Sequence, residues 1–163
     1  GPLMHADALP NRGGFWVTRH RPKIDRIASP WLIRRFIDRS ARFLFVAPNQ
    51  VLNVAEKFNA IPFDVPDCDW THKNDKCTFD AILQGFDLHL PALDHMARII
   101  RAADMDALSS EPEAAGLLAL SLGLSRMYRN DLEQLEQGFT LYDALFRWAR
   151  DATGETHVWE EGK

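Results

Sequence analysis

The chain has 163 residues, the size of one domain that can bury most of the surface of its unfolded form. Its net charge of −4, with 46% hydrophobic and 26% charged residues, is typical of a globular protein and argues against general affinity for DNA or anionic membranes. Two cysteines, Cys68 and Cys77, are too few for a disulfide framework and favour a reduced, cytoplasmic protein. The longest apolar run, 114–124, is too short to span a bilayer, so we expect no membrane contact.

We expect a single domain over residues 4–153. Gly1–Leu3 resemble the remnant of a protease cleavage site, with the natural start near Met4. Residues 154–163 are expected to form a flexible tail.

The first half alternates strand-like and helix-like segments. The run FWVTR is short, aromatic and β-branched, as strands are. The pair Ser29-Pro30 predicts a helix N-cap followed by proline at the first helical position. The β-α-β-α-β order predicts a small three-stranded sheet with parallel neighbours. The expected elements are strands over 15–19, 43–47 and 60–64, and helices over 30–41 and 51–58.

The second half predicts about four helices, so the fold class is α/β with a helical C-terminal half. The helix over 112–125 is apolar almost all round, which predicts a central position. Apolar residues of the last helix, from Leu132 to Ala149, are spaced 3-4-3-4-3. This short seam favours packing within the domain over a homodimer through the C-terminal helix. The four helices are expected over 77–86, 91–104, 112–125 and 131–152.

A basic segment covers Thr18 to Arg42. It holds eight of the 19 Lys and Arg residues but only two of the 23 Asp and Glu residues, Asp25 and Asp38. Guanidinium groups suit carboxylates and tetrahedral oxyanions. The segment therefore predicts either internal ion pairs or an anion site.

Six separated blocks resemble the chromate-resistance (ChrB-type) domain family, over about residues 15–151. The resemblance implies a role in the response to chromate stress, either as this domain alone or as the C-terminal half of a chromate-responsive transcription regulator. In such fused relatives a separate N-terminal part would bind DNA. The family pattern leads us to expect a cysteine where Ser29 stands, so no role of that thiol carries over. The blocks are TRHRPKIDRIASPWLIRRFID, FLFV, IPFDV, HKNDKCTFDAIL, EAAGLLALSLGLSRMYRND and LYDALFRWARD.

The first candidate site binds a small oxyanion. Chromate is a tetrahedral dianion like sulfate, and Arg19 and Arg26 could converge on it with the helix N-terminus near Ser29. The resemblance adds Arg34 and Arg35. The alternative is that these arginines pair with acidic residues of the chain.

The second candidate site binds iron, zinc or manganese through His72, Cys77 and Asp80. Imidazole, thiolate and carboxylate are metal ligands, and three protein ligands with one open position are typical of a catalytic metal. Cys77 and Asp80 lie three residues apart and share a helix face. The alternative is a buried Cys77 beside a helix-capping Asp80. Spacing cannot rank the possible further ligands His20, His89, His95, Asp104 and Glu113.

The third candidate is a redox thiol. A Cys77 thiolate at a helix N-terminus would have a depressed pKa, and chromate is a strong oxidant. Cys77, with Asp80, would then be catalytic, and Cys68 would act as the resolving thiol.

Two functional hypotheses stay open. One is a ligand-sensing or regulatory module that binds an oxyanion through arginines, which the fused arrangement of the family favours. The other is a metal-dependent or thiol-redox enzyme around His72, Cys77 and Asp80. Whether the protein is an enzyme is undecided at this point.

Overall fold

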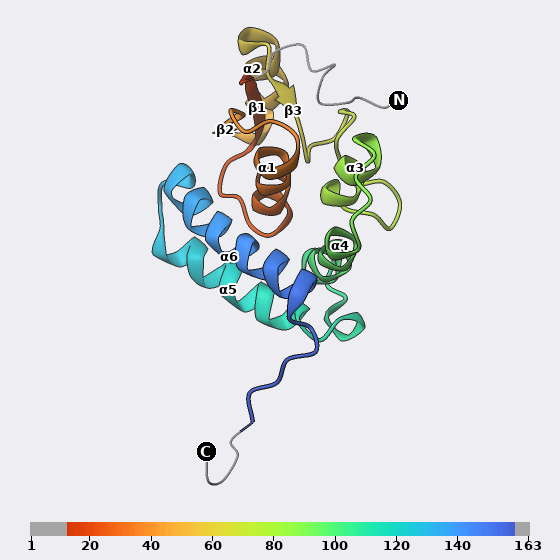
Figure 1. Ribbon diagram of the computed structural model, residues 1–163. Helices are drawn as coiled ribbons and strands as arrows, with labels where there is room; N and C mark the ends of the chain where they lie inside the picture. The colour runs from red at the N-terminus through yellow and green to blue at the C-terminus, as the bar shows by residue number, and fades with distance from the viewer. Residues whose placement is uncertain (1–12, 159–163) are drawn as a thin grey trace.

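The computed structural model describes residues 13–158, so the predicted remnant at Gly1–Leu3 and the end of the predicted tail lie outside the described residues. A small parallel sheet and α2 lie at one end, α3, α4 and α6 pack around α1, and α5 packs on α4 and α6 (Figure 1). None of the helices in this part of the chain is long and apolar enough to cross a membrane. The elements are β1 (Phe15–Arg19), α1 (Asp25–Phe36), β2 (Arg42–Val46), α2 (Val51–Phe58), β3 (Ile61–Pro62), α3 (Thr78–Gly85), α4 (Pro91–Asp104), α5 (Ala114–Met127) and α6 (Asp131–Asp151).

The sheet has the order β2-β1-β3, and both neighbours of β1 run parallel to it. Side chains alternate along a strand, so Trp16 and Val17 of β1 face opposite sides. Trp16 joins the main core with the helical half, whereas Val17 packs against α2 in a smaller cluster. The predicted α/β class and the parallel pairing are therefore confirmed.

The predicted limits of α1 are wrong at both ends. The helix begins at Asp25, and Pro30 lies inside it, where its missing N–H removes one helical hydrogen bond. Ser29 does not cap the helix but is buried within it, and its hydroxyl donates to Asp25 at 3.0 Å. The helix ends at Phe36, and the Asp38 carboxylate beyond it accepts the N–H of Ser40 in the following turn at 3.0 Å and the N–H of Gly13, before β1, at 2.7 Å.

The predicted central position of α5 is also wrong. Only Ala114, Leu117 and Ser121 of this helix are buried, and Leu120 is 56% exposed. The middle of the α6 seam lies in the core instead, with Leu135, Phe139 and Tyr142 buried, whereas Leu132 at its start is exposed. Because α5 is apolar almost all round, several of its faces could be buried. In the structure α4 and α6 cover only one of them.

Aromatic side chains fix α1 at the centre of the helical half. Trp31 is 1% exposed, and its indole N–H donates to Asp143 of α6 at 2.7 Å. Its ring centroid lies 6.5 Å from that of Phe79 on α3 and 5.8 Å from that of Phe146 on α6. These contacts hold the N-terminus of α3 close to α1.

Candidate metal centre

Two aspartates lie beyond the carboxyl ends of neighbouring strands. Asp25 follows β1 and Asp64 follows β3, and both are buried. The chain crosses from β1 to β2 on one side and then returns to β3 on the other, so the direction of winding changes between β1 and β3. Ligands of open parallel sheets bind outside the carboxyl ends of the strands at this kind of switch point.

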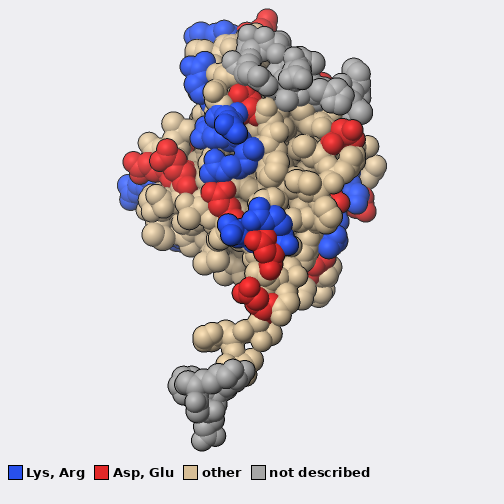
Figure 2. All heavy atoms as spheres, in the orientation of Figure 1, with Lys and Arg blue, Asp and Glu red and all other residues tan. Residues whose placement is uncertain are grey.

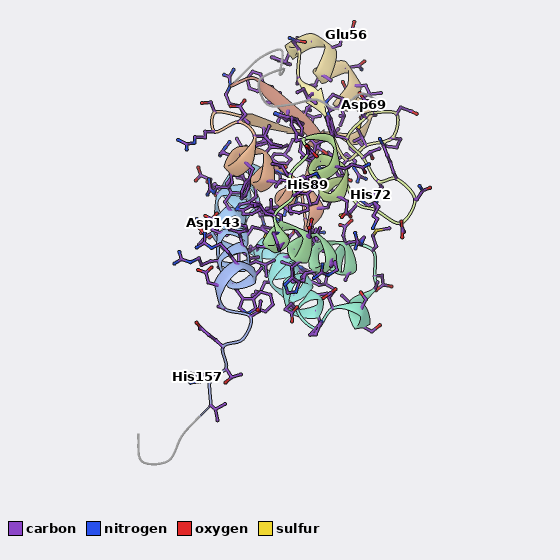
Figure 3. The ribbon with its side chains drawn as sticks, turned by 45° about the vertical axis from the view of Figure 1, so that its right-hand side comes forward. Glu56, Asp69, His72, His89, Asp143 and His157 are labelled. Carbon is purple, nitrogen blue, oxygen red and sulfur yellow. The ribbon has the colours of Figure 1, made fainter. Side chains whose placement is uncertain are left out.

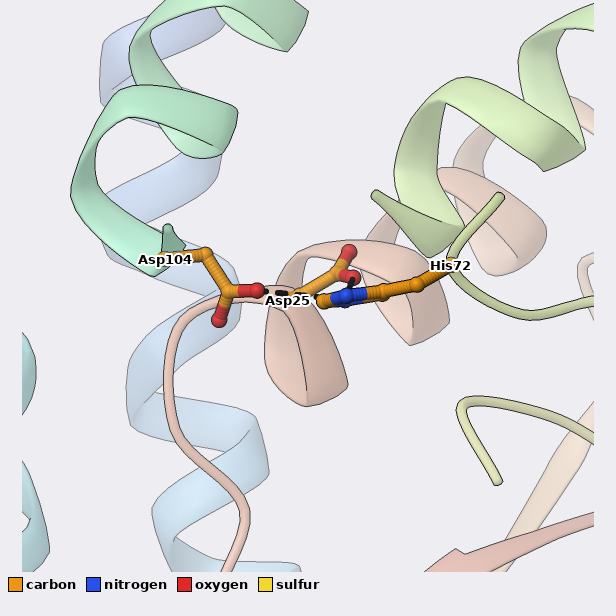
Figure 4. A group of neighbouring side chains, drawn as sticks. All are labelled: Asp25, His72 and Asp104. Atoms are coloured by element: carbon orange, nitrogen blue, oxygen red, sulfur yellow. Dashed lines mark hydrogen bonds and ion pairs between the residues drawn. The ribbon is translucent and has the colours of Figure 1, made fainter. Parts of the chain in front are cut away.

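A histidine nitrogen sits among three carboxylates at this place. Nε2 of His72 lies 3.2 Å from Asp25 Oδ2, 3.3 Å from Asp64 Oδ1 and 3.2 Å from Asp104 Oδ2. His72 comes from the loop before α3, and Asp104 is the last residue of α4. Figure 4 shows the Asp25, His72 and Asp104 side chains pointing at one another from three separate segments.

Asp25 is positioned by the backbone on both sides of its carboxylate. Ile24, just before it, has a φ of 47°, a left-handed conformation that is rare for a β-branched residue and is typical of functional sites. The Asp25 oxygens accept the N–H groups of Thr78 at 2.8 Å and Phe79 at 2.9 Å. Asp25 therefore fixes the start of α1 to the N-terminus of α3.

Asp64 is held by a hydroxyl and approached by two guanidinium groups. The Thr78 hydroxyl donates to Asp64 Oδ1 at 2.8 Å. Arg26 Nε lies 3.4 Å and an Arg19 terminal nitrogen 3.6 Å from Asp64 Oδ2. Thr78, fully buried, thus orients two carboxylates at once, through its N–H to Asp25 and its hydroxyl to Asp64.

The crowding of charges shifts the pKa values of the cluster. The hydrogen bond to Asp25, with the negative charges of Asp64 and Asp104, raises the pKa of His72 to about 9. Burial, followed by the charges of Asp25 and Asp64, raises the pKa of Asp104 to about 6. Burial and the charge of Asp25 also raise the pKa of Asp64. All three shifts reduce the net negative charge of the site.

We expect the stability of the metal-free domain to fall as the pH rises from about 6.5 to 9. His72 has a higher pKa folded than its unfolded value near 6.5, so its contribution is complete below 6.5 and is lost as the pH passes about 9. The check is the melting temperature of chelator-treated protein, which should fall by about 2–4 °C for each kcal/mol lost. The His72→Ala variant should lack this slope; an equal slope in that variant would contradict the assignment.

The predicted ligands Cys77 and Asp80 lie together but apart from this cluster. Asp80 Oδ2 accepts the Cys77 N–H at 3.0 Å, and Oδ1 pairs with Arg101 at 2.8 Å. Cys77 is fully buried, and this burial raises the pKa of its thiol, opposite to the direction predicted for a reactive thiolate. Burial also raises the pKa of Cys68. The structure therefore joins His72 to carboxylates and not to the thiol.

The four predicted oxyanion ligands fall into two pairs with different partners. Arg19 and Arg26 lie beside Asp64, as described above. Arg34 donates to the Ala41 carbonyl and lies over an aromatic ring of α6, and Arg35 makes two hydrogen bonds to Asp143, at 2.9 and 3.0 Å. Basic and acidic side chains are interspersed on the face seen in Figure 2. The second pair thus fastens α1 to β2 and α6.

Other histidines offer weaker alternatives. His95, Glu111 and Glu113 form a second group of possible ligands, with His95 Nε2 3.9 Å from Glu113. His89 pairs with Asp87 and is mostly exposed. Figure 3 shows where His72 and His89 lie in the fold.

Of the residues in this cluster, the sequence pattern predicts His72 as a ligand and Asp104 as one of five possible further ligands, and it predicts neither Asp25 nor Asp64. In the sequence, Asp25 stands out only as a counter-charge within the basic segment. The positions of Asp25 after β1 and of Asp64 after β3 are the features that could have indicated this cluster.

Comparisons with known proteins agree on one family. The family model described as "ChrB, C-terminal domain" matches residues 16–149. Protein ChrB of Cupriavidus metallidurans (strain ATCC 43123 / DSM 2839 / NBRC 102507 / CH34) is 30% identical over 147 residues, which are 90% of this chain and 44% of the relative. The chain thus spans less than half the length of that relative. No solved structure matches the chain.

Proposed function

The chain belongs to the family of ChrB C-terminal domains, and from this premise we propose that it serves chromate resistance as a metal-binding domain. The proposed ligands are Asp25, His72 and Asp104; Asp64 lies beside them, 3.3 Å from His72 Nε2, and would have to move to join them as a fourth ligand. The observation that carries the proposal is the single His72 nitrogen with three carboxylate oxygens 3.2–3.3 Å away.

The spacing of these atoms suits a shared metal ion. With ligand bonds of about 2.0–2.2 Å, two neighbouring ligands of one ion at octahedral or tetrahedral angles lie roughly 2.8–3.6 Å apart. The three distances from His72 Nε2 fall in this range. Asp25, His72 and Asp104 each offer one ligand atom within 4.8 Å of the other two.

The charges also favour a cation. Arg26 and Arg19 lie beside Asp64, but an imidazolium cation at His72 balances only one of the other two carboxylates, and its single Nε2–H can point at one oxygen at a time. Burial of uncompensated carboxylates is costly. A divalent ion bound by neutral imidazole adds one more positive charge and contacts all the ligands together.

The ligand types narrow the choice of ion. Without the Cys77 thiolate, the proposed set is one imidazole and up to three carboxylates, a hard set rich in oxygen. Such ligands suit manganese and iron better than soft metals. Among iron, zinc and manganese, we propose Mn(II) or Fe(II).

A bound ion would connect segments far apart in the sequence. Asp25 begins α1, Asp104 ends α4, and His72 lies in the loop between Asp64 and α3. Loading or loss of the ion would therefore change how this loop is held against the helices. This supports a sensing role, in which binding or loss of the ion changes the conformation of the rest of a regulator. The alternative is an enzyme that catalyses a metal-dependent reaction at the same ion.

A second candidate function is oxyanion binding at the edge of the same site. Arg19 Nε is buried and has no hydrogen-bond partner within residues 13–158, although the side chain is 41% exposed. A tetrahedral oxyanion bound to the metal could accept this N–H and displace the weak contact with Asp64. Arg34 and Arg35 are engaged elsewhere and are not part of this candidate.

We expect wild-type protein to bind one Mn(II) ion in isothermal titration calorimetry. The variants His72→Ala and Asp104→Ala should each bind Mn(II) at least about 100-fold more weakly, because each variant removes one proposed ligand. His89→Ala is the matched control, since it removes an exposed histidine that also has a carboxylate neighbour. The same titration with sulfate, using Arg19→Ala, tests the second candidate.

Unchanged Mn(II) affinity in His72→Ala would overturn the metal assignment. Loss of the ion in His95→Ala, with retention in His72→Ala, would move the site to the second histidine group instead.

A further inference from the structure

A separate cavity begins at Lys73, the residue after His72. It has a volume of about 570 Å³, within the range of small-molecule sites, and is bounded by residues 73–76, α3 and α4. The proposed metal ligands do not line it. His89, labelled in Figure 3, lies on its wall.

The charged side chains on the wall are mostly basic. On a chain with a net charge of −4, such a concentration of positive charge favours an anionic ligand. The basic members are Lys73, Lys76, Arg98 and Arg101, and the acidic members are Asp80 and Asp94.

The two arginines already have carboxylate partners, but the lysines do not. Arg101 pairs with Asp80 at 2.8 Å and Arg98 with Glu111 at 3.3 Å. Within residues 13–158, no carboxylate lies at ion-pair distance from Lys73 or Lys76. These lysines are therefore the groups whose charge a ligand would neutralise.

The backbone holds the two lysines as a pair. The N–H of Lys73 donates to the Lys76 carbonyl at 3.1 Å, and the reverse bond measures 3.0 Å. Asn74, inside this turn, takes the left-handed conformation with a φ of 57°. A fixed turn lowers the entropic cost of directing both ammonium groups at one ligand.

The rest of the wall includes apolar side chains. Ala81 and Leu83 come from α3, Leu88 from the following turn, and Ala97 from α4. Such a surface suits the hydrocarbon or aromatic body of a ligand and not a bare inorganic ion. We propose that this cavity binds a small organic anion, in which a carboxylate, sulfonate or phosphate group meets Lys73 and Lys76 and an apolar body lies between α3 and α4.

The test uses 8-anilinonaphthalene-1-sulfonate, a probe that combines an anionic group with an aromatic body. Fluorescence titration of the folded, full chain should show saturable binding. Lys73→Gln/Lys76→Gln should weaken it by about tenfold or more, because two charge-assisted contacts are lost. Both lysines are exposed, so the variant is expected to fold, which circular dichroism checks.

The matched control is Lys23→Gln/Lys57→Gln, which removes two exposed lysines outside the cavity and should leave the affinity unchanged. The uncharged analogue N-phenyl-1-naphthylamine should bind about tenfold more weakly. Equal probe affinity in the Lys73/Lys76 variant and the wild type, or probe-induced amide NMR shifts that map outside residues 73–101, would overturn the proposal.

Discussion

Asp25→Ala is expected to lower the free energy of unfolding by about 3–5 kcal/mol, the largest effect of any single change at the site. The substitution removes the acceptor of two backbone N–H groups, of Thr78 and Phe79, and of the Ser29 hydroxyl. Buried donors without a partner are costly, and the attachment of α1 to α3 is lost. Urea denaturation followed by circular dichroism measures the change.

Two further variants separate the structural role of Asp25 from its proposed metal role. Asp69→Ala removes an exposed aspartate of the neighbouring loop and should change stability by less than about 0.5 kcal/mol. Asp25→Asn keeps one acceptor oxygen, so it should fold better than Asp25→Ala and still bind Mn(II) poorly. If Asp25→Ala were as stable as Asp69→Ala, the role of Asp25 in joining the two helices would be wrong.

Gly85→Ala is expected to destabilise the domain by about 1–3 kcal/mol and to weaken Mn(II) binding, although Gly85 is not a proposed ligand. A Cβ atom on Gly85 would lie 2.2 Å from the Trp70 ring. Trp70 stacks on Phe86 and belongs to the same loop as His72, two residues earlier. Displacing the ring should therefore move His72 away from the carboxylates.

Gly116→Ala provides the control for this variant. Apart from its chain neighbours and the backbone of its own helix, no atom lies within 4 Å of the position of its Cβ, in the first turn of α5. Alanine favours the helix over glycine by about 0.5–1 kcal/mol, so this variant should be slightly more stable than wild type. Melting temperatures and Mn(II) titrations of both variants test the prediction. If Gly85→Ala bound Mn(II) with wild-type affinity, the position of His72 would not depend on the position of the Trp70 ring.

Local patterns were sufficient for much of the fold. The strand at Phe15–Arg19 and the helices Val51–Phe58 and Pro91–Asp104 match the predicted limits to the residue. Each has a clear hydrophobic pattern and definite ends. The pattern was misleading at α1, because the Ser29-Pro30 pair looks like a helix start. The helix begins instead at Asp25, whose carboxylate accepts N–H groups that lie 53 and 54 residues further along the chain.

The candidate centre was harder to predict because its members come together only through the topology. His72, Cys77 and Asp80 are close in sequence, and this closeness favoured them as a ligand set. In the structure the N-cap geometry directs Asp80 to the Cys77 N–H and Arg101. The parallel sheet instead brings Asp25 and Asp64 to one edge, and α4 adds Asp104, 79 residues beyond Asp25 in the numbering.

The most direct test of the central claim is the position of the ion in a crystal of the wild-type protein grown with Mn(II), located by anomalous scattering. We expect one peak within about 2.0–2.3 Å of His72 Nε2 and of carboxylate oxygens of Asp25 and Asp104. A map with no peak at these residues, or with a peak at His95, Glu111 and Glu113 instead, would contradict it.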